Sequence, residues 1–127
     1  MTIDLAGTSA LVIDNDVESV RILRAALEAY GVRVMAANSS EEAKSLLDAI
    51  SPDIIIAELL LERETGLDFV RWLRSRVADS NIPAIGVTSS HEHFSREDAE
   101  AAGFTMFLRK PVNPMELVIA VALLTHW

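Results

Sequence analysis

The stretch PDIIIAELLLERETG, residues 52–66, determines how the rest of the chain is interpreted. Its isoleucines and the alanine that follows predict a strand over residues 53–58, buried on both faces, because such strands are almost continuously apolar. Glu58 stands at the end of this apolar run, where a loop begins. The question raised by this stretch is why a carboxylate stands at the end of the strand, and why it is the longer of the two carboxylates.

Four further apolar runs alternate with amphipathic helical patterns. The five strands are predicted at residues 9–14, 32–36, 53–58, 83–88 and 104–109. The fourth helix is expected at about 91–101, and the fifth from Pro114 to about Thr125. Strands that alternate with helices over short connections predict a parallel sheet. We therefore expect one α/β domain over residues 1–127, a doubly wound three-layer sandwich with strand order 2-1-3-4-5.

Composition excludes several classes of protein. The chain has 127 residues, half of them apolar, and no cysteine, which excludes disulfides and cysteine-based zinc sites. Its longest apolar stretches are well short of the roughly 20 residues of a membrane span, and no signal peptide is evident. A formal charge of −8 disfavours nucleic-acid binding. We expect a soluble cytoplasmic protein with neither a membrane nor a nucleic-acid partner.

Polar residues stand at the carboxyl ends of four of the predicted strands. They are Asp14, Asn15, Asp16, Glu58, Thr88, Ser89 and Lys110. Each has an ordinary explanation: Asp16 could cap the first helix, and Lys110 could simply pair with Glu58. Because the carboxyl ends of parallel strands share one edge of a doubly wound sheet, these residues are expected to meet there. The sequence thus predicts a functional site at this edge.

Four motifs in order give the chain a resemblance to a known family. They are ALVIDND (10–16), PDIIIAELLLERETGLDFV (52–70), IPAIGVTSS (82–90) and AGFTMFLRKP (102–111). Together they resemble the receiver domain of two-component response regulators, over essentially all of the chain. The resemblance implies a flavodoxin-like fold, a histidine-kinase pathway component as partner, and a non-enzymatic signalling role.

The resemblance also assigns roles to individual positions. The phospho-accepting aspartate of the family falls on Glu58. The two acids that help to hold Mg²⁺ fall on Asp14 and Asn15. Because asparagine carries no charge, Asp14 is expected to form a weak Mg²⁺ site or none, with Asp16 beside it in the same pocket. No cofactor is therefore expected. The switch positions fall on Thr88, Phe107 and Lys110. A cis Lys110–Pro111 bond is implied as well.

Glu58 is one methylene longer than aspartate, which moves its carboxylate outward by about 1.5 Å. A displacement near 1 Å can cost roughly 100-fold in rate. The leading hypothesis is a receiver that acts through protein–protein interaction without phosphorylation, Glu58 being a fixed stand-in for the phosphoaspartate. One alternative is a phospho-switch whose acceptor is Asp14 or Asp16. Another is a small α/β nucleotide- or ligand-binding enzyme, which the absence of a glycine-rich phosphate loop disfavours.

The last helix, MELVIAVALLT over residues 115–125, is apolar on every side apart from Glu116. A helix of this kind is normally buried all round, or its outer face is an interface. With Met115, Val118, Ile119 and Ala122 facing the sheet, the residues expected outside are Leu117, Val121 and Leu124. They predict a homodimer or partner contact, with burial by neighbouring loops or by a further C-terminal segment as the alternative.

Overall fold

The computed structural model describes residues 2–76, 78–79, 81–90 and 92–126 of the chain. Five parallel strands form one sheet in the order β2-β1-β3-β4-β5, as predicted. The elements are β1 (Ser9–Ile13), α1 (Val17–Glu28), β2 (Arg33–Ala37), α2 (Ser40–Leu47), β3 (Ile54–Glu58), α3 (Gly66–Ser75), β4 (Ala84–Thr88), α4 (Arg96–Ala102), β5 (Met106–Arg109) and α5 (Pro114–Thr125). Every predicted strand is present within two residues of its expected ends.

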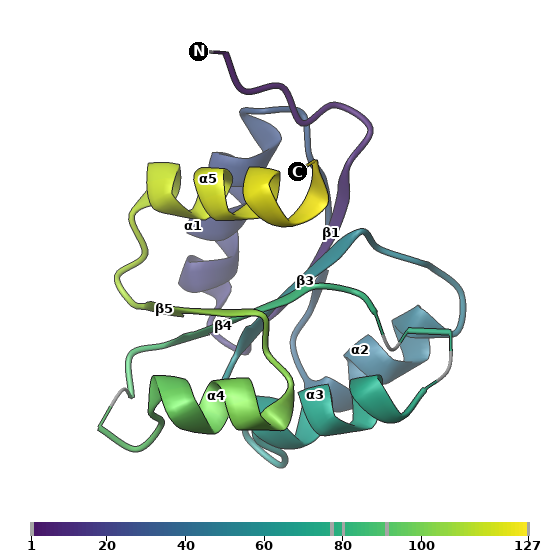
Figure 1. Ribbon diagram of the computed structural model, residues 1–127, viewed down its shortest axis with the longest axis vertical. Helices are drawn as coiled ribbons and strands as arrows, with labels where there is room; N and C mark the ends of the chain where they lie inside the picture. The colour runs from purple at the N-terminus through teal and green to yellow at the C-terminus, as the bar shows by residue number, and fades with distance from the viewer. Residues whose placement is uncertain (1, 77, 80, 91, 127) are drawn as a thin grey trace.

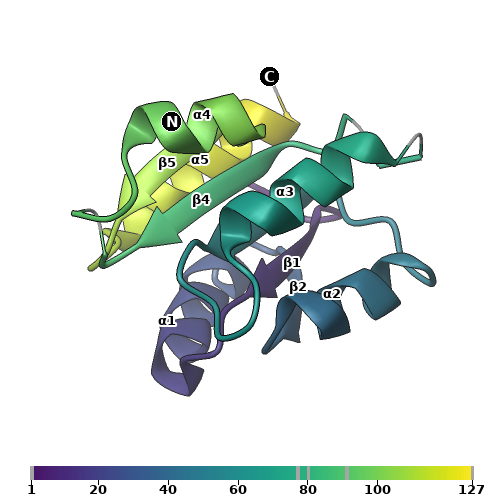
Figure 2. The same cartoon turned by 90° about the horizontal axis from the view of Figure 1, so that it is seen from below.

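The sheet lies between two layers of helices. Helices α1 and α5 cover one face, and α2, α3 and α4 cover the other (Figures 1 and 2). The side chains of β3 alternate between the two cores: Ile55 and Ala57 pack on the α2–α3–α4 side, and Ile54 and Ile56 pack on the α1–α5 side. This two-sided burial is the physical reason for the unbroken apolar run in the sequence.

Each helix begins at a polar capping residue, which satisfies a backbone N–H group in its first turn. The caps are Asp16, Ser39, Thr65, Ser95 and Asn113. The prediction for the fourth helix was wrong at its start, because Ser95 and Asp98 form a capping box that begins α4 at Arg96. Residue 91, the expected start, lies outside the described residues.

The sheet topology brings the predicted polar residues to one edge. Ile13 of β1 pairs with Ala57 of β3, so the residues that follow them, Asp14 and Glu58, stand on adjacent strands. Thr88 at the end of β4 pairs with Arg109 of β5, which directly precedes Lys110. Within the described part of the chain, no helix is long and apolar enough to cross a membrane.

Candidate functional site at the carboxyl edge of the sheet

The end of β1 supplies a buried carboxylate. Asp14 is 1% exposed, and its Oδ1 accepts a 2.9 Å hydrogen bond from the backbone N–H of Asp16. The Asp16 side chain in turn caps α1, as one of its interpretations predicted, by accepting from the N–H of Glu18. Hydrogen bonds from the Ser19 hydroxyl and from that N–H keep the pKa of Asp16 below its ordinary value. The hydrogen bond to Asp16 thus holds Asp14 against the residue that caps α1.

The end of β3 supplies the second buried carboxylate. Glu58 is only 5% exposed, and its two oxygens have different partners. Oε2 accepts a 2.8 Å hydrogen bond from the backbone N–H of Leu60, and Oε1 lies 2.8 Å from Nζ of Lys110. Gly66 at the start of α3 lets the helix approach the backbone at the end of β3, because a Cβ there would lie 2.5 Å from the carbonyl oxygen of Glu58. The side chain is therefore held at both oxygens.

Lys110 places one ammonium between the two carboxylates. Its Nζ lies 2.6 Å from Oδ2 of Asp14 and 2.8 Å from Oε1 of Glu58, and it donates to Oγ of Ser19 at 3.1 Å. These three acceptors use all three donors of an ammonium group. The backbone N–H of Lys110 bonds the carbonyl of Thr88 at 3.0 Å, and the Lys110–Pro111 bond is cis, as implied. We call these three charged side chains the Asp14–Glu58–Lys110 triad.

Burial and ion pairing act in opposite directions on the pKa of Lys110. Burial lowers it, because the charged form loses water, whereas the hydrogen bonds to Asp14 and Glu58 raise it. The net effect is a pKa above the ordinary value of 10.5. The ammonium is thus charged at neutral pH, and the triad, with two carboxylates, carries a formal charge of −1.

The other two predicted switch residues lie deeper in the fold. Thr88 is fully buried, and its Oγ1 accepts a 3.0 Å hydrogen bond from the N–H of Ser90 in the loop that follows β4. Phe107 is 4% exposed and packs on the α4 side of the sheet, where the Arg96 guanidinium lies 5.8 Å from its ring centroid. Among the described residues, neither Thr88 nor Phe107 lines the cleft beside the triad.

An open cleft of about 600 Å³ borders the triad. Its lining residues are Asp14, Asn15, Asp16, Glu58, Leu60, Leu61, Glu62, Ser89 and Lys110. The structure thus brings the predicted acidic residues together with Lys110. Sequence reasoning missed Ser19, whose hydroxyl completes the shell of Lys110. A serine one turn into an ordinary helix carries no signal of an ammonium 91 positions away.

Comparison with known proteins agrees with this fold. The model of the family described as "Response regulator receiver domain" matches residues 10–122 of the chain. The chain belongs to the receiver-domain family of response regulators. Over 114 residues it is 32% identical to an uncharacterized 14.6 kDa protein of Leptolyngbya boryana, covering 90% of this chain and 87% of that protein. It is 32% identical over 123 residues to the KDP operon transcriptional regulatory protein KdpE of Escherichia coli, and spans 52% of that protein's length and 94% of its own.

A solved two-component response regulator from Clostridium difficile has the same fold. It superposes on this receiver domain with a TM-score of 0.86 and is 26% identical, covering 94% of this chain and 96% of that one. The structural likeness therefore extends over nearly the whole of both chains.

The receiver family implies Mg²⁺ at this edge, and the residues present do not fit it. Mg²⁺ prefers near-octahedral oxygen ligands. Here all four oxygens of Asp14 and Glu58 accept from protein donors, and Lys110 takes one oxygen of each. Asn15 adds no charge, and the carboxylate of Asp16 caps α1.

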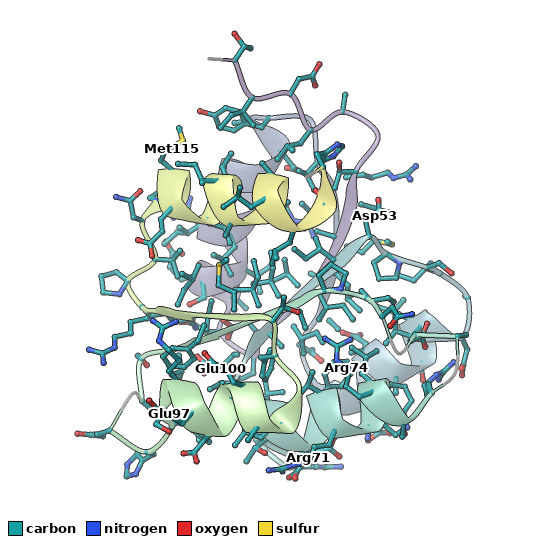
Figure 3. All side chains as sticks on the ribbon, viewed as in Figure 1. Asp53, Arg71, Arg74, Glu97, Glu100 and Met115 are labelled. Atoms are coloured by element: carbon teal, nitrogen blue, oxygen red, sulfur yellow. The ribbon has the colours of Figure 1, made fainter. Side chains whose placement is uncertain are left out.

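The interface predicted on the last helix, α5, was placed on the wrong residues. Leu117 and Val121 are fully buried in the core that α5 shares with α1 and the sheet, and Leu124 is partly buried against the same core. The exposed row is instead Met115, Ile119 and Leu123, at 43%, 44% and 47%. Met115 points away from the body of the protein (Figure 3). A helix apolar all round has no polar face to fix its rotation, so periodicity selected the wrong face.

Proposed function

We propose that this chain is a receiver-type signalling module that works through protein–protein interaction and does not depend on aspartyl phosphorylation. The observation that carries the proposal is the direct contact between Glu58 and Lys110, at 2.8 Å. By resemblance, Glu58 occupies the position of the phospho-accepting aspartate. Its carboxylate is a permanent partner of the lysine that a phosphoryl group would otherwise meet.

Physical chemistry makes Glu58 a poor phosphoryl acceptor. Phosphoryl transfer to a carboxylate depends on positioning and charge neutralisation, and an error near 1 Å costs roughly 100-fold. Glu58 is buried, and each of its oxygens is hydrogen-bonded, which leaves no oxygen presented freely to a donor. Its single charge stands in for the charge of about −1.5 to −2 that a phosphate would bring.

The alternative acceptors are less suitable still. Asp14 is 1% exposed, with one oxygen on the N–H of Asp16 and the other on Lys110. Asp16 is accessible, but its carboxylate caps α1 and accepts from the Ser19 hydroxyl. Phosphorylation of either residue would remove contacts that hold the start of α1.

A protein partner is the output that the remaining surface supports. The row of Met115, Ile119 and Leu123 on α5 is apolar and half-exposed, as docking surfaces are. A component of a histidine-kinase pathway is the partner class that family membership favours. The function is thus that of a fixed docking module.

The test is intact-mass measurement after incubation with acetyl phosphate or phosphoramidate and Mg²⁺. We expect no stoichiometric phosphoryl group on the wild type. The double variant N15D/E58D, which returns the residue types usual in the family, is the matched comparison, and an ordinary receiver checks the reagents. Stoichiometric addition to a carboxylate of the wild type would overturn the proposal.

A further inference from the structure

We propose that the exposed apolar row of helix α5 is the contact surface for a second copy of this chain, and that the two copies meet through this helix alone. The row consists of Met115, Ile119 and Leu123, which are 43%, 44% and 47% exposed. The inference rests on the proposed function in so far as both treat the row as a docking surface. It goes further because it names the partner and leaves helix α4 outside the contact.

The row matches itself under a two-fold axis. Its three residues are spaced by four positions, so they form one ridge about 12 Å long on the surface of the helix. When two such helices pack antiparallel with Ile119 at the centre, Ile119 lies opposite its own copy. Met115 of each chain then lies opposite Leu123 of the other. A patch that is complementary to itself is what a two-fold dimer requires.

The distribution of charge favours α5 as the face through which two copies can approach. Each chain has a formal charge of −8, so two copies repel one another unless few charges lie at their contact. Helix α5 carries one charged residue, Glu116, in 12 positions. Every other described helix is shorter or of equal length and carries at least three. The row of α5 is thus an apolar surface on which acidic copies can meet.

Helix α4 carries acids in place of an apolar row. Its Glu97 and Glu100 are exposed, and Figure 3 shows them on α4, on the other side of the sheet from Met115 of α5. The one cation of α4, Arg96, lies over the ring of Phe107. A contact that covered α4 would remove these carboxylates from water without a free cation of the same helix to pair with them, which is costly. The contact is therefore confined to α5.

The contact is small, so the dimer is expected to be weak. The row supplies three half-exposed side chains per chain, whereas a stable interface uses roughly 20–30 residues on each side. The dimer should therefore exchange with free monomer, and its share should increase with protein concentration.

Sedimentation velocity tests the inference over a range from about 10 µM to about 1 mM, where a weak dimer becomes populated. We expect the weight-average sedimentation coefficient of the wild type to rise with concentration. Ile119→Glu places a carboxylate beside its own copy at the two-fold axis. This variant should raise the apparent dissociation constant at least about tenfold.

Ile22→Glu is the matched control. Ile22 lies on α1 and is 47% exposed, so the variant makes the same chemical change, with the same net charge, on an equally exposed isoleucine outside the row. It should associate as the wild type does. Circular dichroism checks that each variant is folded, and Leu123→Glu replaces Ile119→Glu if the latter does not fold.

A charge swap identifies the partner as a second copy. Ile119→Lys alone should associate as poorly as Ile119→Glu alone, because like charges then meet at the axis. An equimolar mixture of the two variants should associate more strongly than either one by itself, because each lysine then lies opposite a glutamate. A partner of another kind would give no such gain.

Three results would overturn the inference: a wild type that remains monomeric over the whole range, a dimer that the folded Ile119→Glu or Leu123→Glu leaves intact, or one that Ile22→Glu weakens equally. A monomeric wild type that accepts no phosphoryl group would leave the proposed function standing, with a different protein on the row. A wild type that accepts a phosphoryl group would overturn that function, whatever its oligomeric state.

Discussion

The Asp14–Glu58–Lys110 triad and the inner face of helix α5 are both buried, but by different kinds of interaction. In the triad, buried polar atoms are matched to specific donors and acceptors at distances of 2.6–3.1 Å. In α5, apolar side chains point in all directions, and packing alone separates the buried Leu117 from the exposed Leu123. Polar burial thus fixes individual partners, whereas apolar burial only requires that some face be covered.

The largest expected effect tests whether burial gives the triad its strength. We expect Lys110→Met to lower the free energy of unfolding by about 3–5 kcal/mol, because it leaves two carboxylates buried without their cation. Lys44→Met is the matched control, since it makes the same change in a lysine that forms a 3.0 Å ion pair with Glu64. The side chains of Lys44 and Glu64 are 29% and 30% exposed. That change should cost about 1 kcal/mol or less.

Urea unfolding of both lysine variants measures the difference. Equal losses for Lys110→Met and Lys44→Met would show that the triad is no stronger than a surface pair. Burial of the triad would then not explain its contribution to stability.

The next effect tests the orientation of α5. We expect Leu117→Ala to lower the free energy of unfolding by about 3 kcal/mol, because it leaves a cavity in the core beneath the helix. Leu123→Ala makes the identical chemical change on the exposed face of the same helix. Its effect should be within about 0.5 kcal/mol.

Urea or thermal unfolding of the two leucine variants decides between the two rotations of the helix. A reversed order, with Leu123→Ala the more damaging, would restore the orientation that the sequence pattern suggested.

The smallest expected effect is the pH dependence of the triad. The folded pKa of Lys110 lies above its ordinary value of 10.5, so its contribution to stability is fully present below that pH. The contribution is lost as pH rises through the raised folded pKa. Asp14, Glu58 and Asp16 face the ammonium, and Lys44 is the only other lysine of the chain.

Urea unfolding across the alkaline range should therefore show a steeper loss of stability in the wild type than in Lys110→Met. Parallel curves for the two proteins would mean that pairing in the triad does not favour the charged lysine.

Much of the candidate site was predictable because parallel strands impose a common edge. Asp14, Glu58 and Lys110 each stand at the end of a recognisable apolar strand, and strand order then makes them neighbours. Ser19 and the N–H of Leu60 were not predictable, because neither contact has a local sequence signal. The start of α4 was misplaced, since the capping box at Ser95 competes with earlier serines of the same loop.

The sequence by itself determined the five-stranded parallel sheet, its order, and the set of charged residues at its carboxyl edge. These follow from local apolar runs and from the alternation of strands and helices, which depend on neighbouring residues alone. Only the tertiary structure decided which face of α5 is buried and how the oxygens of Glu58 are shared between Leu60 and Lys110. The buried face of α5 and the contact between Glu58 and Lys110 depend on how segments far apart in the chain pack together, and no local pattern encodes that.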